Sequence, residues 1–379
     1  MKREGHSVTS GARPRASSRK GIARSAGAAG VIGLFALVAS AGACGGGAAN
    51  KPPEPPPQPT ASAAVGAADA VDSAVAGPKM GGESAPASGD DVQKGIVALK
   101  AGDVNGARAA FEVALGKNPA KADAHHYLAL VNDQTGRKAE AEKGYRKALE
   151  LDPGLEESAI NLAAILVETG KYDEAAALMK KAIAKNPKSA ALQVNLGMAL
   201  SGKNDVAGAS KAFEEAIKLE PNNGIHLVTY AGHLARNNKK DEAITKLKQA
   251  EKASVNDAGV LASVALEYKG MKDFKTCIAV LDKAVHVKDV AELRIYRGTC
   301  KLGLKDLPGA TTEFKDAVAK EPNNALAHYS LGNALADGGK LPEAIAEWET
   351  YLKLAPDGPQ AKAAERKIGI AKAKAGAKK

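Results

Sequence analysis

The stretch Gly170 to Pro187, GKYDEAAALMKKAIAKNP, reads as a turn, an amphipathic helix and a stop. Glycine tolerates the positive φ that a tight turn needs, and proline cannot continue a helix because it has no amide hydrogen. The same order of small, large and small residues followed by proline returns 34 residues away in either direction. The stretch therefore belongs to a repeat.

A small residue marks the same place in each unit, at intervals of 34 residues with a single interval of 33: Ala107, Ala141, Ala175, Ala209, Ala243, Cys277, Ala310 and Ala344. A bulky side chain follows four residues later: Phe111, Tyr145, Met179, Phe213, Leu247, Leu281, Phe314 and Trp348. A spacing of four places both residues on one helix face. A second small residue recurs upstream, in a preceding helix, at Gly95, Ala129, Ala163, Gly197, Ala231, Ala265, Gly298 and Gly332. Each unit is therefore predicted to be two helices held together through small residues.

The connections between helices agree with this assignment. Glycines at 136, 170 and 339 interrupt the pattern where a turn is required, and prolines at 119, 153, 187, 221, 322 and 356 follow the second helices. Val255 and Asp289 replace this proline in the fifth and sixth units. The junction between the sixth and seventh units is also one residue short, so we expect irregular geometry there.

This pattern resembles the tetratricopeptide repeat, with eight units in tandem over residues 88–357. The resemblance implies an all-α fold, an α-solenoid wound as a right-handed superhelix. Residues 358–379 would form a capping helix and a basic tail, since residues 359–375 alternate apolar and basic positions at helical spacing.

The first 43 residues have a different character. A basic run precedes the apolar segment 28–43, which is short for a membrane span and is typical of a secretory signal. Ala41 to Cys44 resembles a bacterial lipobox, although that family usually has leucine where Ala41 stands. The resemblance implies that Cys44 carries a lipid that anchors the chain to a membrane of the bacterial cell envelope, with the repeats in the periplasm. The alternative is that Cys44 merely lies near a cleavage site or an uncleaved anchor.

Residues 44–87 are rich in Gly, Ala and Pro and lack a large apolar periodicity, which predicts a disordered tether. The formal charge of the chain, +10, would suggest a nucleic-acid partner. However, the first 44 residues hold seven basic residues and one acid, and without them the balance is 46 basic against 42 acidic residues. We therefore expect no nucleic-acid binding.

No combination of residues predicts catalysis, a metal, a cofactor or a small-molecule substrate. His125 and His126 are adjacent and point to different faces, and His226 and His233 have no accompanying ligands at metal-site spacing. The two remaining cysteines, Cys277 and Cys300, lie in successive antiparallel helices. We favour two buried thiols, with a disulfide as the alternative if the compartment is oxidising.

The family resemblance implies that the first helices line a concave groove that binds other proteins. In phase with the repeat, the groove residues would be Leu130, Ile160, Asn161, Val194, Asn195, Met198, Val228, Leu266, Ile295 and Tyr329. The charges expected on the groove are Asp123, Asp133, Glu157 and Glu168 at one end and Arg236 and Lys269 further along. Some of the apolar residues could instead pack between consecutive first helices, so both readings stay open.

Two functions remain. The first is a membrane-tethered scaffold that assembles protein partners in the envelope. The alternative is a regulatory subunit that activates a separate envelope enzyme such as a cell-wall synthase. We do not expect a catalytic domain for sugar transfer or hydrolysis, because the repeats take up residues 88–357.

Overall fold

The computed structural model describes residues 90–376, so the predicted signal, Cys44 and the predicted tether lie outside the described residues. Within residues 90–376 every regular element is a helix: α2 (Asp91–Lys100), α3 (Val104–Lys117), α4 (Ala122–Gln134), α5 (Lys138–Leu151), α6 (Glu156–Glu168), α7 (Tyr172–Lys185), α8 (Ala190–Gly202), α9 (Val206–Leu219), α10 (Gly224–Arg236), α11 (Lys240–Ala253), α12 (Ala258–Gly270), α13 (Phe274–Val287), α14 (Ala291–Gly303), α15 (Leu307–Lys320), α16 (Ala325–Asp337), α17 (Leu341–Leu354) and α18 (Ala361–Gly376). None of these helices is long and apolar enough to cross a membrane.

A three-residue turn joins the two helices of each unit, and its middle residue has a positive φ. This residue is Gly102, Gly136, Gly170 or Gly339 in four units, and Asn204, Asn238, Lys272 or Lys305 in the others. The same backbone hydrogen bond closes the turn in both groups, for example from the Lys171 amide to the Leu166 carbonyl at 2.7 Å and from the Asp205 amide to the Leu200 carbonyl at 2.9 Å. Glycine is thus favourable in this turn but not required, because the closing hydrogen bond belongs to the backbone.

The two helices of a unit meet through the small residues that the repeat pattern identified. A Cβ atom added at Gly197 would lie 2.8 Å from the ring of Phe213, and one added at Gly298 would lie 2.6 Å from the ring of Phe314. The bulky residues of all eight units are buried. Close approach of the helix backbones at the small residue and filling of the remaining space by the large one therefore hold each hairpin together.

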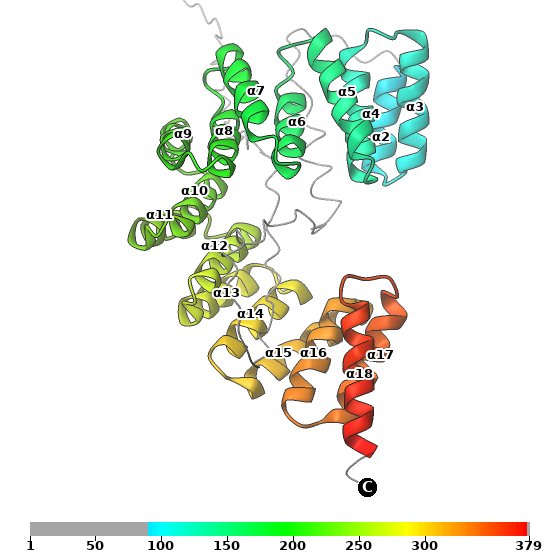
Figure 1. Ribbon diagram of the computed structural model, residues 1–379, viewed down its shortest axis with the longest axis vertical. Helices are drawn as coiled ribbons and strands as arrows, with labels where there is room; N and C mark the ends of the chain where they lie inside the picture. The colour runs from blue at the N-terminus through cyan, green and yellow to red at the C-terminus, as the bar shows by residue number, and fades with distance from the viewer. Residues whose placement is uncertain (1–89, 377–379) are drawn as a thin grey trace, which may run out of the picture.

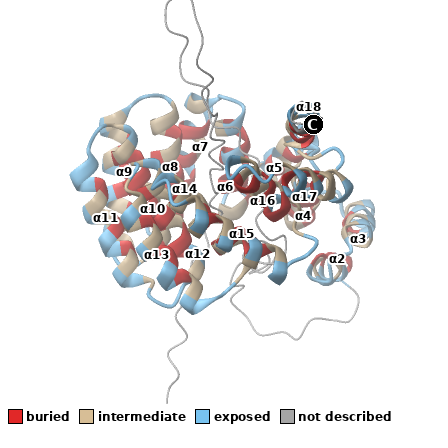
Figure 2. Ribbon diagram, turned by 90° about the horizontal axis from the view of Figure 1, so that it is seen from below, coloured by how far each residue is buried: buried red, intermediate tan, exposed pale blue. Residues whose placement is uncertain are grey.

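The eight hairpins stack into a curved array. In Figure 1 the second helices, such as α9, α11 and α13, lie on the outer side of the curve, and the first helices, such as α8, α10 and α12, lie on the inner side. Figure 2 shows the buried segments where helices meet and exposed residues on the outer helices. The last helix, α18, packs against α17 through Ala364 and Ile368. The predicted all-α solenoid is confirmed for the described residues.

Candidate partner-binding surface

Most of the predicted groove residues are part of the core of the array. Seven of the ten are at most 8% exposed: Leu130, Ile160, Asn161, Val194, Asn195, Val228 and Ile295. Val194 and Val228 belong to one apolar cluster that extends over several hairpins. Consecutive first helices such as α6 and α8, or α10 and α12, contact each other directly. The expectation that these seven residues are exposed on a groove is therefore corrected, because neighbouring first helices share them as packing.

The two asparagines illustrate this correction. The side-chain amide of Asn195 donates a hydrogen bond of 2.9 Å to the carbonyl of Ala191, one turn earlier in α8. Asn161 occupies the equivalent place in α6 and is 8% exposed. The side-chain amide of Asn195 thus bonds within its own helix, in the buried part of the array.

Three predicted groove residues, Met198, Leu266 and Tyr329, are partly exposed. Tyr329 is covered in part by the capping helix, since the ammonium of Lys367 lies 4.9 Å from its ring centroid and donates a hydrogen bond of 2.6 Å to Asn333. Ile225 of α10 is also partly exposed. We define Met198 of α8, Ile225 of α10 and Leu266 of α12 as the inner apolar patch, which lies on three consecutive first helices.

The acidic residues expected on the groove differ in their availability. The ammonium of Lys138 in α5 pairs with Asp133 at 2.7 Å and with Glu168 at 3.0 Å, so these two carboxylates already share a cation. Burial raises the pKa of Tyr127, as do the negative charges of Glu157 and Asp123. The carboxylates of Asp123 and Glu157 therefore make the surface near the starts of α4 and α6 electrostatically negative.

A charged group lies next to the inner apolar patch. The carboxylate of Glu267 and the guanidinium of Arg236 both approach Gly232, where an added Cβ would lie 2.8 Å from Glu267 Oε1 and 3.3 Å from Arg236 Nη1. Burial raises the pKa of Glu267, and the positive charge of Arg236 opposes this rise. Burial also lowers the pKa of Lys269, one turn beyond Leu266. Two cations and one acid thus lie beside an apolar patch on α10 and α12.

Sequence reasoning identified Arg236 and Lys269 but missed Glu267. Its position in α12 corresponds to Ile165, Ala199 and Ala334 in other first helices. A charged residue in a column of mainly small and apolar residues is the signal that would have found it.

His226 and His233 are buried residues of the array that contact neighbouring polar side chains. His233 is fully buried and its ring nitrogens contact the hydroxyls of Ser201 at 2.9 Å and Ser210 at 3.3 Å. His226 lies 3.5 Å from Glu220, and burial lowers its pKa. No cluster of three or more metal-ligating side chains occurs among residues 90–376.

The expectation that Cys277 and Cys300 are free thiols is wrong. Cys277 of α13 and Cys300 of α14 form a disulfide, so the alternative to two buried thiols is the one present. The two helices are antiparallel neighbours whose contact brings the Cα atoms to 6.4 Å, within the range that a disulfide bridges.

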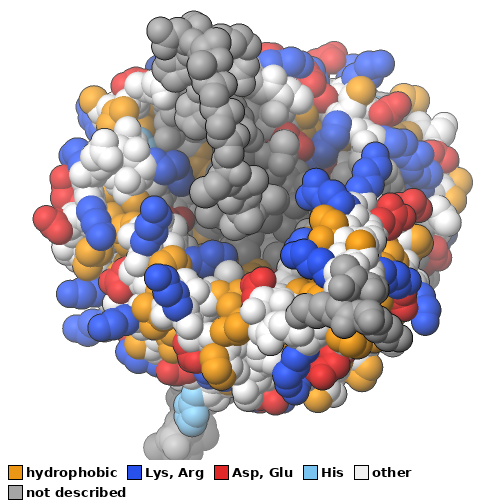
Figure 3. Space-filling view, turned by 60° about the horizontal axis from the view of Figure 1, so that its bottom comes forward, with side chains coloured by type: hydrophobic (Ala, Val, Ile, Leu, Met, Phe, Trp, Pro, Cys, Tyr) orange, Lys and Arg blue, Asp and Glu red, His pale blue; other side chains and the backbone are white. Residues whose placement is uncertain are grey.

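Basic residues are distributed rather than concentrated. Figure 3 shows Lys and Arg side chains scattered over the visible face among acidic and apolar ones. Many are paired between units, as Arg146 is with Glu174 at 2.7 Å. A continuous basic surface of the kind that binds nucleic acid is not seen on this face.

Comparisons with known proteins agree with this architecture. Two models described as tetratricopeptide repeat match residues 96–255 and 297–359, together more than half of the chain. The crystal structure of yeast Tom70 aligns with a TM-score of 0.64 and 19% identity, covering 81% of this chain and 69% of that one. A tetratricopeptide repeat protein from Parabacteroides merdae aligns with a TM-score of 0.48 and 19% identity, covering 65% of this chain and 97% of that one. Only the first alignment bears on the fold. A search of curated proteins finds no match.

Proposed function

Because the chain belongs to the tetratricopeptide repeat family, we propose that it is a scaffold that binds a segment of a partner protein on its inner side. The observation that supports this most strongly is the inner apolar patch, Met198, Ile225 and Leu266. These side chains stay partly exposed on consecutive first helices, whereas most other apolar residues of the predicted groove are buried in the array.

The chemistry of the patch favours a mixed partner segment. Apolar side chains of the partner would cover Met198 and Leu266. Because both are already partly buried, each would contribute only a fraction of the roughly 1.5 to 3 kcal/mol that full burial of an exposed side chain gives, before the costs of association. Acidic groups of the partner would meet Arg236 and Lys269, and basic groups would meet Asp123 and Glu157. An amphipathic segment with charges of both signs fits this distribution.

The experiment replaces Met198 and Leu266 with glutamate and compares capture of proteins from an envelope extract by the immobilised full chain. Proteins held by the wild type and lost with Met198→Glu/Leu266→Glu are the expected result. Val113→Glu is the matched control, since Val113 is 49% exposed on the second helix α3 and should leave capture unchanged. Identical sets of captured proteins for all three would refute binding on the inner apolar patch.

We further propose that the scaffold is tethered to a membrane of the bacterial envelope through a lipid on Cys44, with the repeats in the periplasm. Support comes from the lipobox-like residues Ala41 to Cys44 and from the Cys277–Cys300 disulfide, since disulfides persist mainly in oxidising compartments. Cells fed labelled palmitate should label the wild type and not Cys44→Ala. Label that persists in the variant would contradict the anchor and would leave the proposed binding surface unaffected.

A further inference from the structure

The junction between the sixth and seventh repeats differs from the other junctions of the array. Only three residues, 288–290, join α13 to α14, whereas four residues join the hairpins elsewhere, as at 186–189 between α7 and α8. The proline that follows most second helices is absent, and Val290 precedes α14 without a side-chain hydrogen bond to the helix end. Among the junctions between hairpins in residues 90–376, this one thus has the shortest linker.

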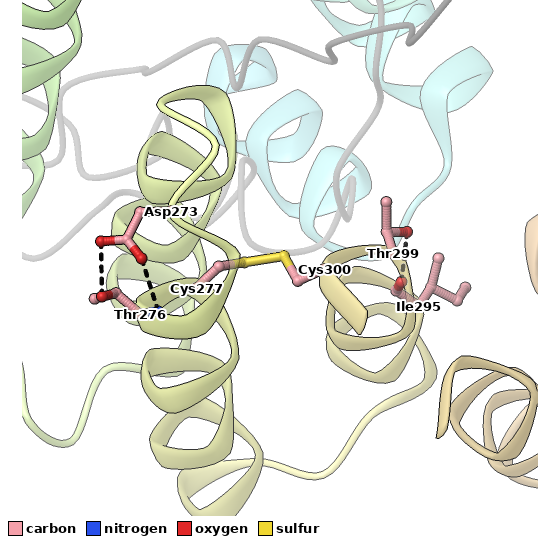
Figure 4. The surroundings of a disulfide bond; sticks show 6 residues. All are labelled: Asp273, Thr276, Cys277, Ile295, Thr299 and Cys300. Atoms are coloured by element: carbon pink, nitrogen blue, oxygen red, sulfur yellow. Dashed lines mark hydrogen bonds between the residues drawn. A yellow bond between two sulfur atoms is a disulfide. The ribbon is translucent and has the colours of Figure 1, made fainter. Parts of the chain in front are cut away.

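A covalent bond lies across the same junction. Cys277 of α13 and Cys300 of α14 are both fully buried, and Figure 4 shows their disulfide bridging the two helices. At the next junction the equivalent residues are Ala310 of α15 and Ala334 of α16, which are buried and uncharged. The disulfide thus occupies a place where the next junction has two small buried side chains.

Buried apolar side chains link the two helices, since Val280 and Leu281 of α13 share one core cluster with Leu293 of α14. Partly exposed ion pairs add to this contact. Arg297 of α14 reaches Asp282 of α13 at 2.8 Å, and Asp289 of the linker reaches Arg294 at 2.7 Å and Lys320 at 2.8 Å. Ion pairs that contact solvent stabilise weakly. The disulfide adds a covalent link to these contacts between α13 and α14.

We propose that the Cys277–Cys300 disulfide is a redox-sensitive clamp that couples the last two repeats and the capping helix, α14–α18, to the preceding part of the array. In a repeat protein the stability of each unit depends on its interface with the neighbouring unit. Loss of one link between units therefore lowers the stability of the short C-terminal block more than that of the long N-terminal one.

The chemistry of the clamp is thiol–disulfide exchange with a dithiol. One thiolate of the dithiol attacks a sulfur of the protein disulfide, and its second thiolate then displaces the protein cysteine and closes a new disulfide within the reagent. Two electrons pass to the protein, and Cys277 and Cys300 each end with a proton from the dithiol. A low-molecular-weight disulfide, acting as oxidant, reverses the exchange. Because both sulfurs are buried, exchange requires the junction to open.

The test measures hydrogen exchange along the full chain in the oxidised protein and after reduction with dithiothreitol. The disulfide joins residues separated by 23 positions, so its loss should lower the protection of amides in α14–α18 by about 100-fold. Amides in α4–α10 should change far less, because these helices can open locally without the junction. The single tryptophan, Trp348 in α17, gives an independent reading, since its fluorescence transition in urea should move to lower concentration on reduction.

Two variants separate the clamp from a general effect of the reductant. Cys277→Ala/Cys300→Ala places alanine in both positions and should behave like the reduced wild type, with no response to dithiothreitol. Adding Ala310→Cys/Ala334→Cys to that variant places two cysteines at the equivalent positions of the next junction. Once peptide mapping shows that they have formed a disulfide, reduction should affect α16–α18. Equal protection of α14–α18 before and after reduction, a uniform loss along all helices, or absence of the Cys277–Cys300 peptide from the oxidised protein would each overturn the proposal.

Discussion

The glycines of the first helices allow a sharp test of how the hairpins are held together. Gly95, Gly197 and Gly298 face phenylalanine, and Gly332 faces tryptophan. The four units with alanine in this position carry Tyr145, Met179, Leu247 or Leu281 as the bulky partner. Small and large residues within each unit are thus matched to one another.

We predict that Gly197→Ala lowers the free energy of unfolding by up to about 2 kcal/mol. The new Cβ would lie 2.8 Å from Cε1 and Cζ of Phe213, far inside normal contact distance. The ring cannot easily move away, because it is buried and its centroid lies 5.5 Å from that of Tyr230 and 5.3 Å from that of His233. Overpacking of this kind costs about 1–3 kcal/mol, of which the higher helix propensity of alanine offsets about 1 kcal/mol.

A second substitution should restore the match. Gly197→Ala/Phe213→Leu reproduces the pair Ala231 and Leu247 of the next unit. Phe213→Leu alone should cost about 1–2 kcal/mol through the space it leaves. The double variant should be more stable than the sum of the single effects predicts, with a coupling free energy of about 1–2 kcal/mol.

The assay is urea unfolding followed by far-ultraviolet circular dichroism. Gly369→Ala is the control, since Gly369 lies in the exposed part of α18 with no neighbouring atom within 4 Å of an added Cβ. That variant should gain up to about 1 kcal/mol from propensity alone. If Gly197→Ala were as stabilising as Gly369→Ala, tight packing at the small residue would not be what holds the hairpin.

Three further changes test other parts of the structure. Val194→Glu should destabilise the fold by about 3 kcal/mol or more, because it buries a carboxylate among apolar side chains, and thermal unfolding unchanged from wild type would place Val194 on an open surface. Burial lowers the pKa of His126 to about 4, below its unfolded value near 6.5, so the unfolded state binds more protons between these pH values. The free energy of unfolding should therefore fall by on the order of 2 kcal/mol as pH drops from 6.5 to 4. His126→Phe should flatten this dependence, and an equal slope in both proteins would contradict the assignment to His126. Glu313→Gln should cost about 3 kcal/mol, because Glu313 is 5% exposed and two cations of α14 bond to its carboxylate, and an unchanged melting temperature would show that these cations find solvent instead.

The hairpin could be predicted from the sequence because its contacts are local and repeated. Residues such as Ala175 and Met179 lie four apart on one helix face, and the same relation recurs at every unit. The turn was predicted only where glycine marks it. Asn204 and Lys272 adopt the same positive φ without glycine, so composition alone gave no signal at those turns.

The exposed surface was harder to predict for a geometric reason. A first helix contacts its own second helix, the previous hairpin and the next first helix, and periodicity does not say which apolar face remains open. Val194 and Met198 lie one turn apart in α8, yet Val194 is buried by neighbouring hairpins and Met198 is partly exposed. The preference for two buried thiols over a disulfide was likewise wrong, since the bond depends on the separation of two helices at a junction with an unusually short linker.

The array therefore uses most of its apolar groove for its own stability, and this limits where a partner can bind. Met198, Ile225 and Leu266 belong to α8, α10 and α12, all of which precede the Cys277–Cys300 clamp. If binding takes place on this patch, reduction should loosen α14–α18 and leave affinity for the partner nearly unchanged. A partner whose affinity falls on reduction would have to contact the last two repeats as well, which would extend the binding surface beyond the clamp to residues such as Tyr329.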